Sequence, residues 1–248
     1  MEVGFKTDKG VRRSNNEDAC FVMKRDKLFV VADGVGGNNS GEIASRTAVT
    51  EITGYFQRNP LERGASADRI REYFHLCINA ANSAVVNKAG RIPRNRGMAT
   101  TIVAAYIDGN IAYIINVGDS RAYLLRDGTL VQITEDHTYV NTLIKAGLIS
   151  EKDALTHENR NMITRAVGAD VQVEADMFTV PVKKDDILLL CTDGLYGEVS
   201  EDEIIRILQT ETVTGDMCNE LVDAANRNGG SDNITMVVLK FTEEDINE

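Results

Sequence analysis

The chain has 248 residues, of which 43% are hydrophobic and 26% are charged, a balance that is ordinary for a soluble globular protein with a large core. Its formal net charge of −11 argues against nucleic acid and anionic membranes as main partners, because phosphate groups are bound by an excess of Lys and Arg. No apolar run approaches the roughly 18 residues needed to cross a bilayer, and the first residues lack the apolar segment of a secretory signal, so we expect no membrane association and a cytoplasmic location.

The four cysteines are scattered along the chain and include no CxxC pair: Cys20, Cys77, Cys191 and Cys218. This spacing favours buried thiols over a zinc knuckle or a disulfide framework. The chain also contains no internal repeat, low-complexity tract or linker rich in Pro, Gly or Ser. The sequence therefore predicts a single domain that spans residues 1–248.

The first predicted strands carry acidic residues at their ends. Residues 3–5 form an expected edge strand, and the apolar runs within residues 19–33 are typical of a β-hairpin. Such a hairpin places Glu17 and Asp18, before its first strand, at the same end as Asp33, which follows its second strand. Two plainer interpretations stay open, because Asp-Gly pairs are common in turns and the polar segment before the hairpin is also compatible with a solvated loop.

Two amphipathic segments follow the hairpin. Apolar residues at helical spacing predict a helix over residues 40–56, capped by Asn39 or Ser40, and a second helix over residues 68–88. We expect both helices to serve as scaffold.

Runs of β-branched residues, separated by turn residues, then predict an antiparallel meander with strands at 100–106, 111–117, 121–125 and 130–133. In this interpretation residues 118–120 form a hairpin turn. Asp119 is then either an ordinary turn residue or a neighbour of the acids at the end of the first hairpin.

Residues 135–168 lose the strand pattern, and short helices are predicted within them at 139–146, 151–155 and 162–167. A long irregular insertion between strands is often a lid or a recognition element.

The last third of the chain returns to regular elements. We expect strands and helices in the order strand 174–180, strand 185–192, helix 200–209, helix 216–226 and strand 234–241.

A later strand repeats the arrangement at Asp33, since an apolar run again ends in an Asp-Gly pair at Asp193, and Asp232 stands just before the last strand. If these acids converge with Asp18, two carboxylates about 4 Å apart repel by roughly 4 kcal/mol at an effective dielectric constant of 20. Hard divalent cations remove this repulsion. Carboxylates together with a backbone carbonyl, such as that of Gly34, form the oxygen shell that Mg²⁺ and Mn²⁺ prefer.

Such a centre suits phosphoryl chemistry. Two ions roughly 3.5–4 Å apart lower the pKa of a shared water and stabilise an in-line displacement at phosphorus. The planar guanidinium of Arg13, in the polar segment before the hairpin, is suited to holding phosphate oxygens. The chain has no GxSxG elbow, GxxxxGK[ST] loop or HExxH sequence, so hydrolysis by water at a metal centre needs the fewest further assumptions.

A set of short motifs in this order closely resembles the bacterial type-2C metal-dependent serine/threonine protein phosphatases, the PPM family. They lie at residues 13–18, 31–37, 97–101, 117–121, 134–137, 191–195 and 231–235. The resemblance covers essentially residues 3–241. It implies an α+β fold, in which a central sandwich of two antiparallel β-sheets is flanked by antiparallel helices in four layers (αββα), with residues 135–168 as a flap insertion that influences substrate choice.

The resemblance also implies a metal ligand set for two Mn²⁺ or Mg²⁺ ions. Asp33 is expected to bridge both ions, the Gly34 carbonyl to bind one, and Asp193 and Asp232 to bind the other. Asp119, together with Asp193, matches the weaker third-metal site of bacterial members.

Other residues receive supporting roles from the same resemblance. Asp18 and Glu17 are expected to act through coordinated water or through contacts with the residues that bind the metals. Asn233 is expected to make such contacts as well. Arg13 matches the phosphate-binding arginine of the family. The reaction implied is attack on phosphorus by a water that bridges the two ions, with Arg13 holding the phosphate.

The sequence departs from the family pattern at Asn38, where bacterial members commonly carry a histidine as candidate general acid, and Val35 occupies the eukaryotic alternative. General acid catalysis is worth about 10²–10⁴-fold, so we expect slow turnover of alkyl phosphates unless His137 or a metal-bound water substitutes. Asn38→His is then expected to accelerate hydrolysis of a phosphopeptide. A second departure is Gly197, where many relatives have an acid, which predicts weak binding of a third ion.

The resemblance implies phosphorylated proteins as substrates and a cognate Ser/Thr kinase whose action is reversed. We also expect a monomeric chain. Two other functions stay open: a pseudophosphatase that acts as a binding module, and a phosphatase dedicated to one regulatory protein. Retention of Arg13 and of the core acids argues against the first. The motifs look more like those of stand-alone kinase antagonists than like those of phosphatases dedicated to one regulatory protein.

Overall fold

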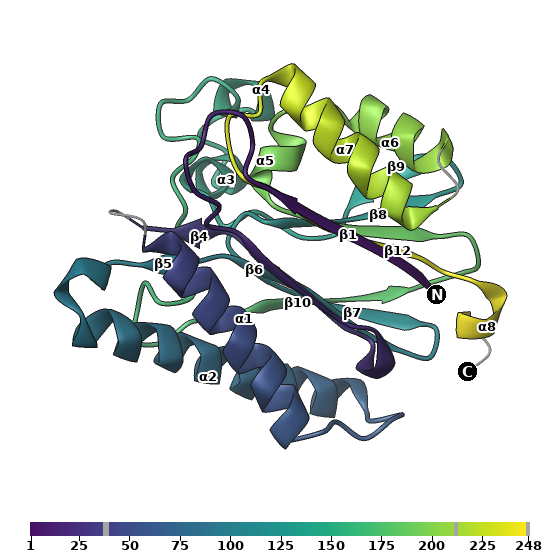
Figure 1. Cartoon of the computed structure of the whole chain (residues 1–248), viewed down its shortest axis with the longest axis horizontal. Coiled ribbons are helices and arrows are strands. Elements are labelled where there is room, and N and C mark those ends of the chain that lie inside the picture. The colour runs from purple at the N-terminus through teal and green to yellow at the C-terminus, as the bar shows by residue number, and fades with distance from the viewer. Residues whose placement is uncertain (37–39, 211–212, 247–248) are drawn as a thin grey trace.

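Ten strands form the two main sheets of the computed structural model, which describes residues 1–36, 40–210 and 213–246. Their bounds are β1 Glu2–Asp8, β2 Ala19–Met23, β3 Leu28–Ala32, β6 Ile102–Asp108, β7 Ile111–Val117, β8 Arg121–Arg126, β9 Thr129–Gln132, β10 Asp176–Pro181, β11 Ile187–Cys191 and β12 Ile234–Lys240. One sheet has the order β1-β12-β11-β8-β9 and the other the order β10-β7-β6-β3-β2. Every neighbouring pair is antiparallel, and the two sheets lie face to face (Figure 1).

Long helices cover the outer face of each sheet (Figure 1). They are α1 Gly41–Arg58 and α2 Ala67–Arg91 on the sheet that contains β3, and α6 Glu201–Thr210 and α7 Thr214–Asn228 on the sheet that contains β11. Shorter elements complete the described chain: β4 Gly34–Val35 paired with β5 Ala99–Thr100, 3₁₀ turns at Lys24–Asp26 and Pro93–Asn95, and helices α3 Tyr139–Lys145, α4 Glu151–Ala154, α5 Asp193–Tyr196 and α8 Glu243–Ile246. The four-layer αββα architecture is confirmed.

The apolar runs are continuous, rather than alternating, in the central strands because both faces of each sheet are covered. In β3, Phe29 and Val31 pack between the two sheets, whereas Leu28, Val30 and Ala32 pack against α1 and α2. All five residues of the strand are buried. The run that ends before Asp33 is therefore packed on both faces, and so is β11, the run that ends before Asp193.

The predicted N-terminal elements are confirmed. β1 lies at a sheet edge, and β2 and β3 form the expected antiparallel hairpin, with Ala19 paired to Ala32. That register places Asp18 and Asp33 at the same end of the sandwich. The long helices at 40–56 and 68–88 are also found, each slightly longer than predicted.

The hairpin turn predicted at residues 118–120 is wrong. β7 pairs with β6 and β10 in one sheet, and β8 pairs with β9 and β11 in the other. Residues 118–120 therefore cross from one sheet to the other. The local Gly-Asp-Ser sequence is the same for a turn and for a crossover, and only the pairing of distant strands distinguishes them.

Other local predictions also differ from the structure. Residues 162–167 are not helical, because Ile163 and Val167 form isolated β-bridges to Thr138 and Thr100. The hydroxyl of Ser40 does not cap α1; it donates a hydrogen bond to the carbonyl of Arg94 at 3.1 Å. The alternative cap, Asn39, lies outside the described residues.

Two short helices escaped prediction because tertiary contacts hold them. The segment that forms α8 contains Asp245, which pairs with the N-terminal ammonium at 2.5 Å. α5 begins at Asp193 itself. Within the described ranges, no helix combines the length and apolarity that crossing a lipid bilayer requires.

Candidate metal centre

Five aspartates lie at one end of the sandwich, each adjacent to a strand end. Asp33 follows β3, Asp193 follows β11, Asp18 and Asp232 precede β2 and β12, and Asp119 lies on the crossover between the sheets. The pKa of Asp33 is raised well above its ordinary value, first by burial of the carboxyl and then by repulsion from the other four acids. The structure thus brings together acids that are far apart in sequence.

Asp18 is the most enclosed of the core acids, with the residue 6% exposed. The hydroxyl of Thr192 donates to Asp18 Oδ2 at 3.0 Å, but Oδ1 is buried with no hydrogen-bond partner among the described residues. Burial raises the pKa of Asp18 to about 7, and repulsion from Asp193 and Asp232 adds to this rise, against the hydrogen bonds from Thr235 and Thr192. A buried carboxylate oxygen without a partner is costly unless a cation binds it.

Asp193 and Asp119 show the same signature. Burial, followed by repulsion from Asp232, raises the pKa of Asp193 to about 6, and its Oδ1 is also buried without a partner in the described chain. Burial, followed by repulsion from Asp193, raises the pKa of Asp119 to about 7. Both acids are therefore destabilised in the charged form that a metal needs.

Asp232 forms an ion pair with Arg13, the expected phosphate-binding residue. Arg13 Nη2 donates to Asp232 Oδ2 at 2.6 Å, and the guanidinium side chain is 54% exposed. The other oxygen, Oδ1, accepts the backbone N–H of Asn233 at 2.8 Å. Arg13 thus lies at the open edge of the acid group, with its cation turned toward the acids.

The backbone around Gly34 is packed too closely for any side chain. A Cβ at this position would collide with the carbonyl oxygens of Gly41 and Glu17, so only glycine fits. Glu17 is held there by its carbonyl, which accepts from Ser45 Oγ at 2.6 Å, and by its N–H, which donates to Asn233 Oδ1 at 2.7 Å.

Asn233 links the segments that carry the acids. Besides accepting from Glu17, its Nδ2 donates to the carbonyls of Lys9 and Asn15 at 2.9 and 2.8 Å. Residue 233 is buried, and it binds the polar segment before β2 to the start of β12. This contact explains how Arg13 and Asp18 come to lie beside Asp232.

The donors present fit a pair of hard divalent cations. They are carboxylate oxygens with desolvated charge, two of which have no partner in the described chain. In the described ranges, however, no three His, Cys, Asp or Glu side chains form a preformed metal-binding group. The acids are gathered but not closed into a coordination shell, and the Arg13 contact keeps one oxygen of Asp232 occupied.

Comparison with known proteins decides the family. Residues 9–235 match the family described as protein phosphatase 2C. The chain belongs to this family. The resemblance carried by the short motifs is thereby confirmed.

Relatives of the phosphatase 2C chain match it over nearly its whole length. The serine/threonine phosphatase stp of Listeria innocua is 37% identical over 243 residues, which are 97% of this chain and 96% of the relative. The crystal structure of the Mycobacterium tuberculosis serine/threonine phosphatase PstP/Ppp has a TM-score of 0.88 at 34% identity, covering 98% of this chain and 99% of that one. A structure of the catalytic domain of PstP in complex with 2 manganese ions has a TM-score of 0.85 at 33% identity, covering 98% of each chain.

Sequence reasoning missed the residues that hold Asp33 in this phosphatase 2C chain. The hydroxyl of Thr101 accepts the N–H of Asp33 at 3.0 Å, and the hydroxyl of Thr100 donates to the carbonyl of Asp33 at 2.7 Å. Thr101 Oγ1 also lies 2.6 Å from Ser120 Oγ. The only signal was the two threonines within a motif, whose hydroxyls could not be assigned partners without the fold.

A second missed group surrounds Asp119. The hydroxyl of Tyr196 donates to the Asp119 carbonyl at 2.9 Å, and the guanidinium of Arg121 stacks 3.7 Å from the Tyr196 ring centre. Arg121 also pairs with Asp136, its Nη2 lying 2.7 Å from Oδ2. Asp136 belongs to the start of residues 135–168, so this pair ties that segment to the acid group.

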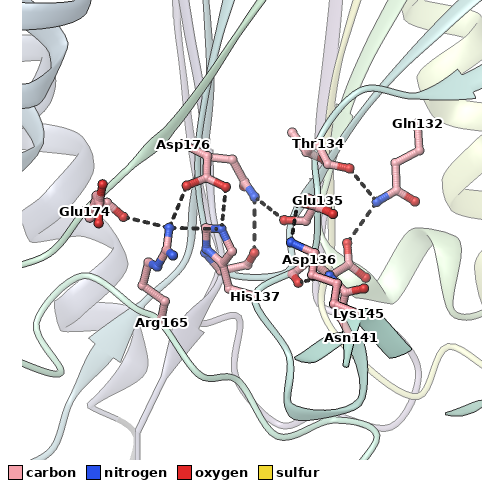
Figure 2. A network of polar contacts seen from close by, with 12 residues as sticks. Gln132, Thr134, Glu135, Asp136, His137, Asn141, Lys145, Arg165, Glu174 and Asp176 are labelled. Carbon is pink, nitrogen blue, oxygen red and sulfur yellow. Dashed lines mark hydrogen bonds and ion pairs between the residues drawn. The ribbon is translucent and has the colours of Figure 1, made fainter. Parts of the chain in front are cut away.

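His137 lies in the polar network shown in Figure 2, among Asp136, Arg165 and Asp176. The residue is 8% exposed, and burial lowers its pKa. Its Nδ1 accepts the N–H of Gly118 at 3.0 Å, and its Nε2 lies 3.1 Å from Asp176 Oδ2. Both ring nitrogens are therefore engaged away from solvent.

Val35 and Asn38 occupy the two positions at which the family pattern places a candidate general acid. Val35 is exposed at the end of β4. Asn38 and Gly37 lie outside the described residues. Gly197, the second departure from the family pattern, follows α5, and its N–H donates to the Asp193 carbonyl at 2.8 Å.

Proposed function

We propose that this chain is a metal-dependent protein serine/threonine phosphatase. The observation that carries the proposal is the gathering of Asp18, Asp33, Asp119, Asp193 and Asp232 at one end of the sandwich, with Arg13 at the open edge. The family match and the relatives' names, which are those of serine/threonine phosphatases, support the same conclusion. Mn²⁺ or Mg²⁺ is the expected cofactor, as in the relative whose structure contains 2 manganese ions.

Asp33 and the Gly34 carbonyl would hold one ion, and Asp193 and Asp232 would hold the second, with Asp33 shared. Glu17 and Asp18 would act through water, and Asp119 with Asp193 would bind a weaker third ion. When bound, the ions supply Lewis acidity toward the phosphate group and lower the pKa of water. The unpartnered oxygens of Asp18 and Asp193 support this assignment.

The residues around the acids prepare the site before any ligand arrives. Thr100 and Thr101 fix the backbone of Asp33, and Asn233 fixes the segment that carries Arg13 and Asp18. Such fixed side chains avoid the cost of reorganising polar groups during the reaction.

Arg13 would hold the phosphate group of the substrate. Its guanidinium is exposed and already binds a carboxylate oxygen, so an oxyanion of a phosphate can take the same donor. Binding of a cation by Asp232 would release Arg13 for this contact.

Arg13→Ala is expected to raise the KM for a phosphothreonine peptide by about 10- to 100-fold, since a hydrogen bond to a charged group is worth roughly 1.5–3 kcal/mol. Steady-state kinetics measure the change, with Arg12→Ala as the matched control. An unchanged KM would assign the phosphate contact to another residue.

The function itself is tested by hydrolysis of para-nitrophenyl phosphate and of a phosphothreonine peptide, with and without Mn²⁺. We expect Mn²⁺-dependent release of phosphate from both. Hydrolysis no faster than that of Asp33→Ala would refute the proposal and would favour a pseudophosphatase that binds partners.

The biological setting is part of the same proposal. Phosphorylated proteins are the substrates, and a cognate Ser/Thr kinase would supply them. We further propose a monomer that consists of one domain, with residues 135–168 as its flap. The four free cysteines are consistent with a reducing compartment such as the cytoplasm. Comparison of the phosphoproteome with and without the protein would name the targets.

A further inference from the structure

Gly118 is the first residue of the crossover that carries Asp119. Its φ of +105° is in the region that favours glycine, and a Cβ there would meet the side chain of Thr101 at 2.6 Å. The segment therefore follows one narrow path from β7 to β8. Both backbone polar groups of Gly118 are bound by the flap residue His137: the Gly118 N–H donates to Nδ1, and the His137 N–H donates to the Gly118 carbonyl, each at 3.0 Å.

These contacts determine the tautomer of the ring. A backbone N–H can only donate, so Nδ1 of His137 must be unprotonated to accept from Gly118. The ring proton then resides on Nε2, which donates to Asp176 Oδ2 at 3.1 Å. Arg165 Nη1 donates to the other oxygen, Oδ1, at 2.7 Å, so two donors share one carboxylate (Figure 2). The same Nη1 lies 3.2 Å from His137 Nε2, a contact that is not a hydrogen bond when both nitrogens carry protons.

The crossover is held at further points beyond Gly118. Tyr196 binds the carbonyl of Asp119, and the hydroxyl of Ser120 lies 2.6 Å from that of Thr101, which accepts the N–H of Asp33. A connected path thus runs from Asp176 through the ring of His137 to Gly118, along the backbone of residues 118–120, and from Ser120 through Thr101 to Asp33.

We propose that His137 is a positioning residue, whose neutral ring, protonated at Nε2, ties the start of the flap to Gly118 and thereby fixes the carboxylate of Asp119 at the metal centre. This role rests on the proposed phosphatase function. It differs from the proton donor considered from the sequence, because both ring nitrogens have partners in the protein and the ring is buried.

Two substitutions separate the positioning role from proton donation. His137→Asn retains an oxygen where Nδ1 accepts from Gly118, but it has no group that titrates as an acid. His137→Gln places its amide nearer to Asp176 and loses the acceptor close to the backbone. His75→Gln, on the exposed face of α2, is the matched control.

If His137 positions the crossover, His137→Asn retains activity within about threefold of the unmodified enzyme on a phosphoserine peptide, whereas His137→Gln loses about tenfold or more on both the peptide and para-nitrophenyl phosphate. An aryl leaving group needs little protonation, so a proton donor would instead give equal losses in both variants on the peptide and little loss on the aryl ester. That second pattern would overturn the proposal, as would two variants indistinguishable from the control.

Hydrogen exchange provides a readout that does not depend on activity. The amide of Gly118 is expected to exchange about tenfold faster in His137→Gln than in His137→Asn, because only the latter retains an acceptor. Equal exchange of the Gly118 amide in both variants contradicts the positioning role of His137. If the unmodified enzyme hydrolyses neither substrate, the proposed function fails, while this exchange experiment still decides whether His137 holds the crossover.

Discussion

Asp33→Asn is expected to abolish Mn²⁺-dependent hydrolysis and, at the same time, to stabilise the metal-free protein. The loss of activity should be about 10³-fold or more, since charge stabilisation by bound metal is worth several kcal/mol and about 1.4 kcal/mol is tenfold in rate. The gain in stability has the opposite origin. Asp33 lies against four other acids that raise its pKa, and a neutral amide removes this repulsion when no cation is present.

Thermal unfolding in the presence of a chelator measures the second effect. We expect a Tm about 2–4 °C higher for Asp33→Asn, the shift that roughly 1 kcal/mol produces in a protein of this size. Mn²⁺ should raise the Tm of the unmodified protein but not that of the variant. Asp223→Asn, at an exposed position of α7, is the control. A lower Tm of Asp33→Asn in chelator would contradict the repulsion that we infer.

Metal removal is expected to make stability strongly dependent on pH. In the folded protein the pKa of Asp18 and that of Asp119 are raised to about 7, and that of Asp193 to about 6, mainly by burial. Unfolded aspartates titrate near 4, so between about pH 4 and pH 7 the folded state binds more protons than the unfolded state. The free energy of unfolding therefore falls as pH rises through this window.

We expect the Tm of the metal-free protein to be roughly 5 °C or more lower at about pH 7.5 than at about pH 5, by linkage of these carboxyls to folding. The lowered pKa values of Asp176 and Asp245 act in the opposite direction below this window. The lowered pKa of His137 acts in the opposite direction within it, but one histidine offsets only part of the effect of three carboxyls. Saturating Mn²⁺ should flatten or reverse the dependence, because metals bind deprotonated carboxylates. A metal-free Tm that is independent of pH in this range would mean that neither burial nor mutual repulsion raises the pKa values of these acids in the folded state.

The response to Mn²⁺ also bears on Asp232 and Arg13. Their contact is partly exposed, so it adds little to stability in the metal-free protein. The contact occupies one carboxylate oxygen of Asp232, which we propose as a metal ligand, with the guanidinium of Arg13. Arg13→Ala is thus expected to weaken peptide binding without removing the effect of Mn²⁺ on Tm.

Local patterns in the sequence were sufficient for most secondary structure and for the core acids. The run before Asp33 and the run before Asp193 predicted strands because apolar residues are continuous where both faces of a sheet are covered. The β2–β3 hairpin was predictable from spacing alone, and its register brought Asp18 and Asp33 to one end. The motifs that resemble the phosphatases then identified the family.

Tertiary structure decided what local sequence left ambiguous. The Gly-Asp-Ser segment at Asp119 was predicted as a hairpin turn, and only the pairing of β8 with β11 rather than with β7 made it a crossover between sheets. The partners of His137 could not be read from the sequence either. Gly118 and Asp176 lie far from it along the chain, and a hydrogen bond depends on distances that folding sets.

The sequence by itself determined which carboxylates are available, that they end or begin strands, and the family to which the chain belongs. The tertiary structure decided how they are held: Thr101 and Asn233 bind the backbones of Asp33 and Glu17, and His137 binds Gly118, the neighbour of Asp119. The physical reason is that side-chain chemistry and periodicity are local properties of the chain. The burial that raises the pKa values and the backbone contacts that orient the acids arise only when distant segments pack together.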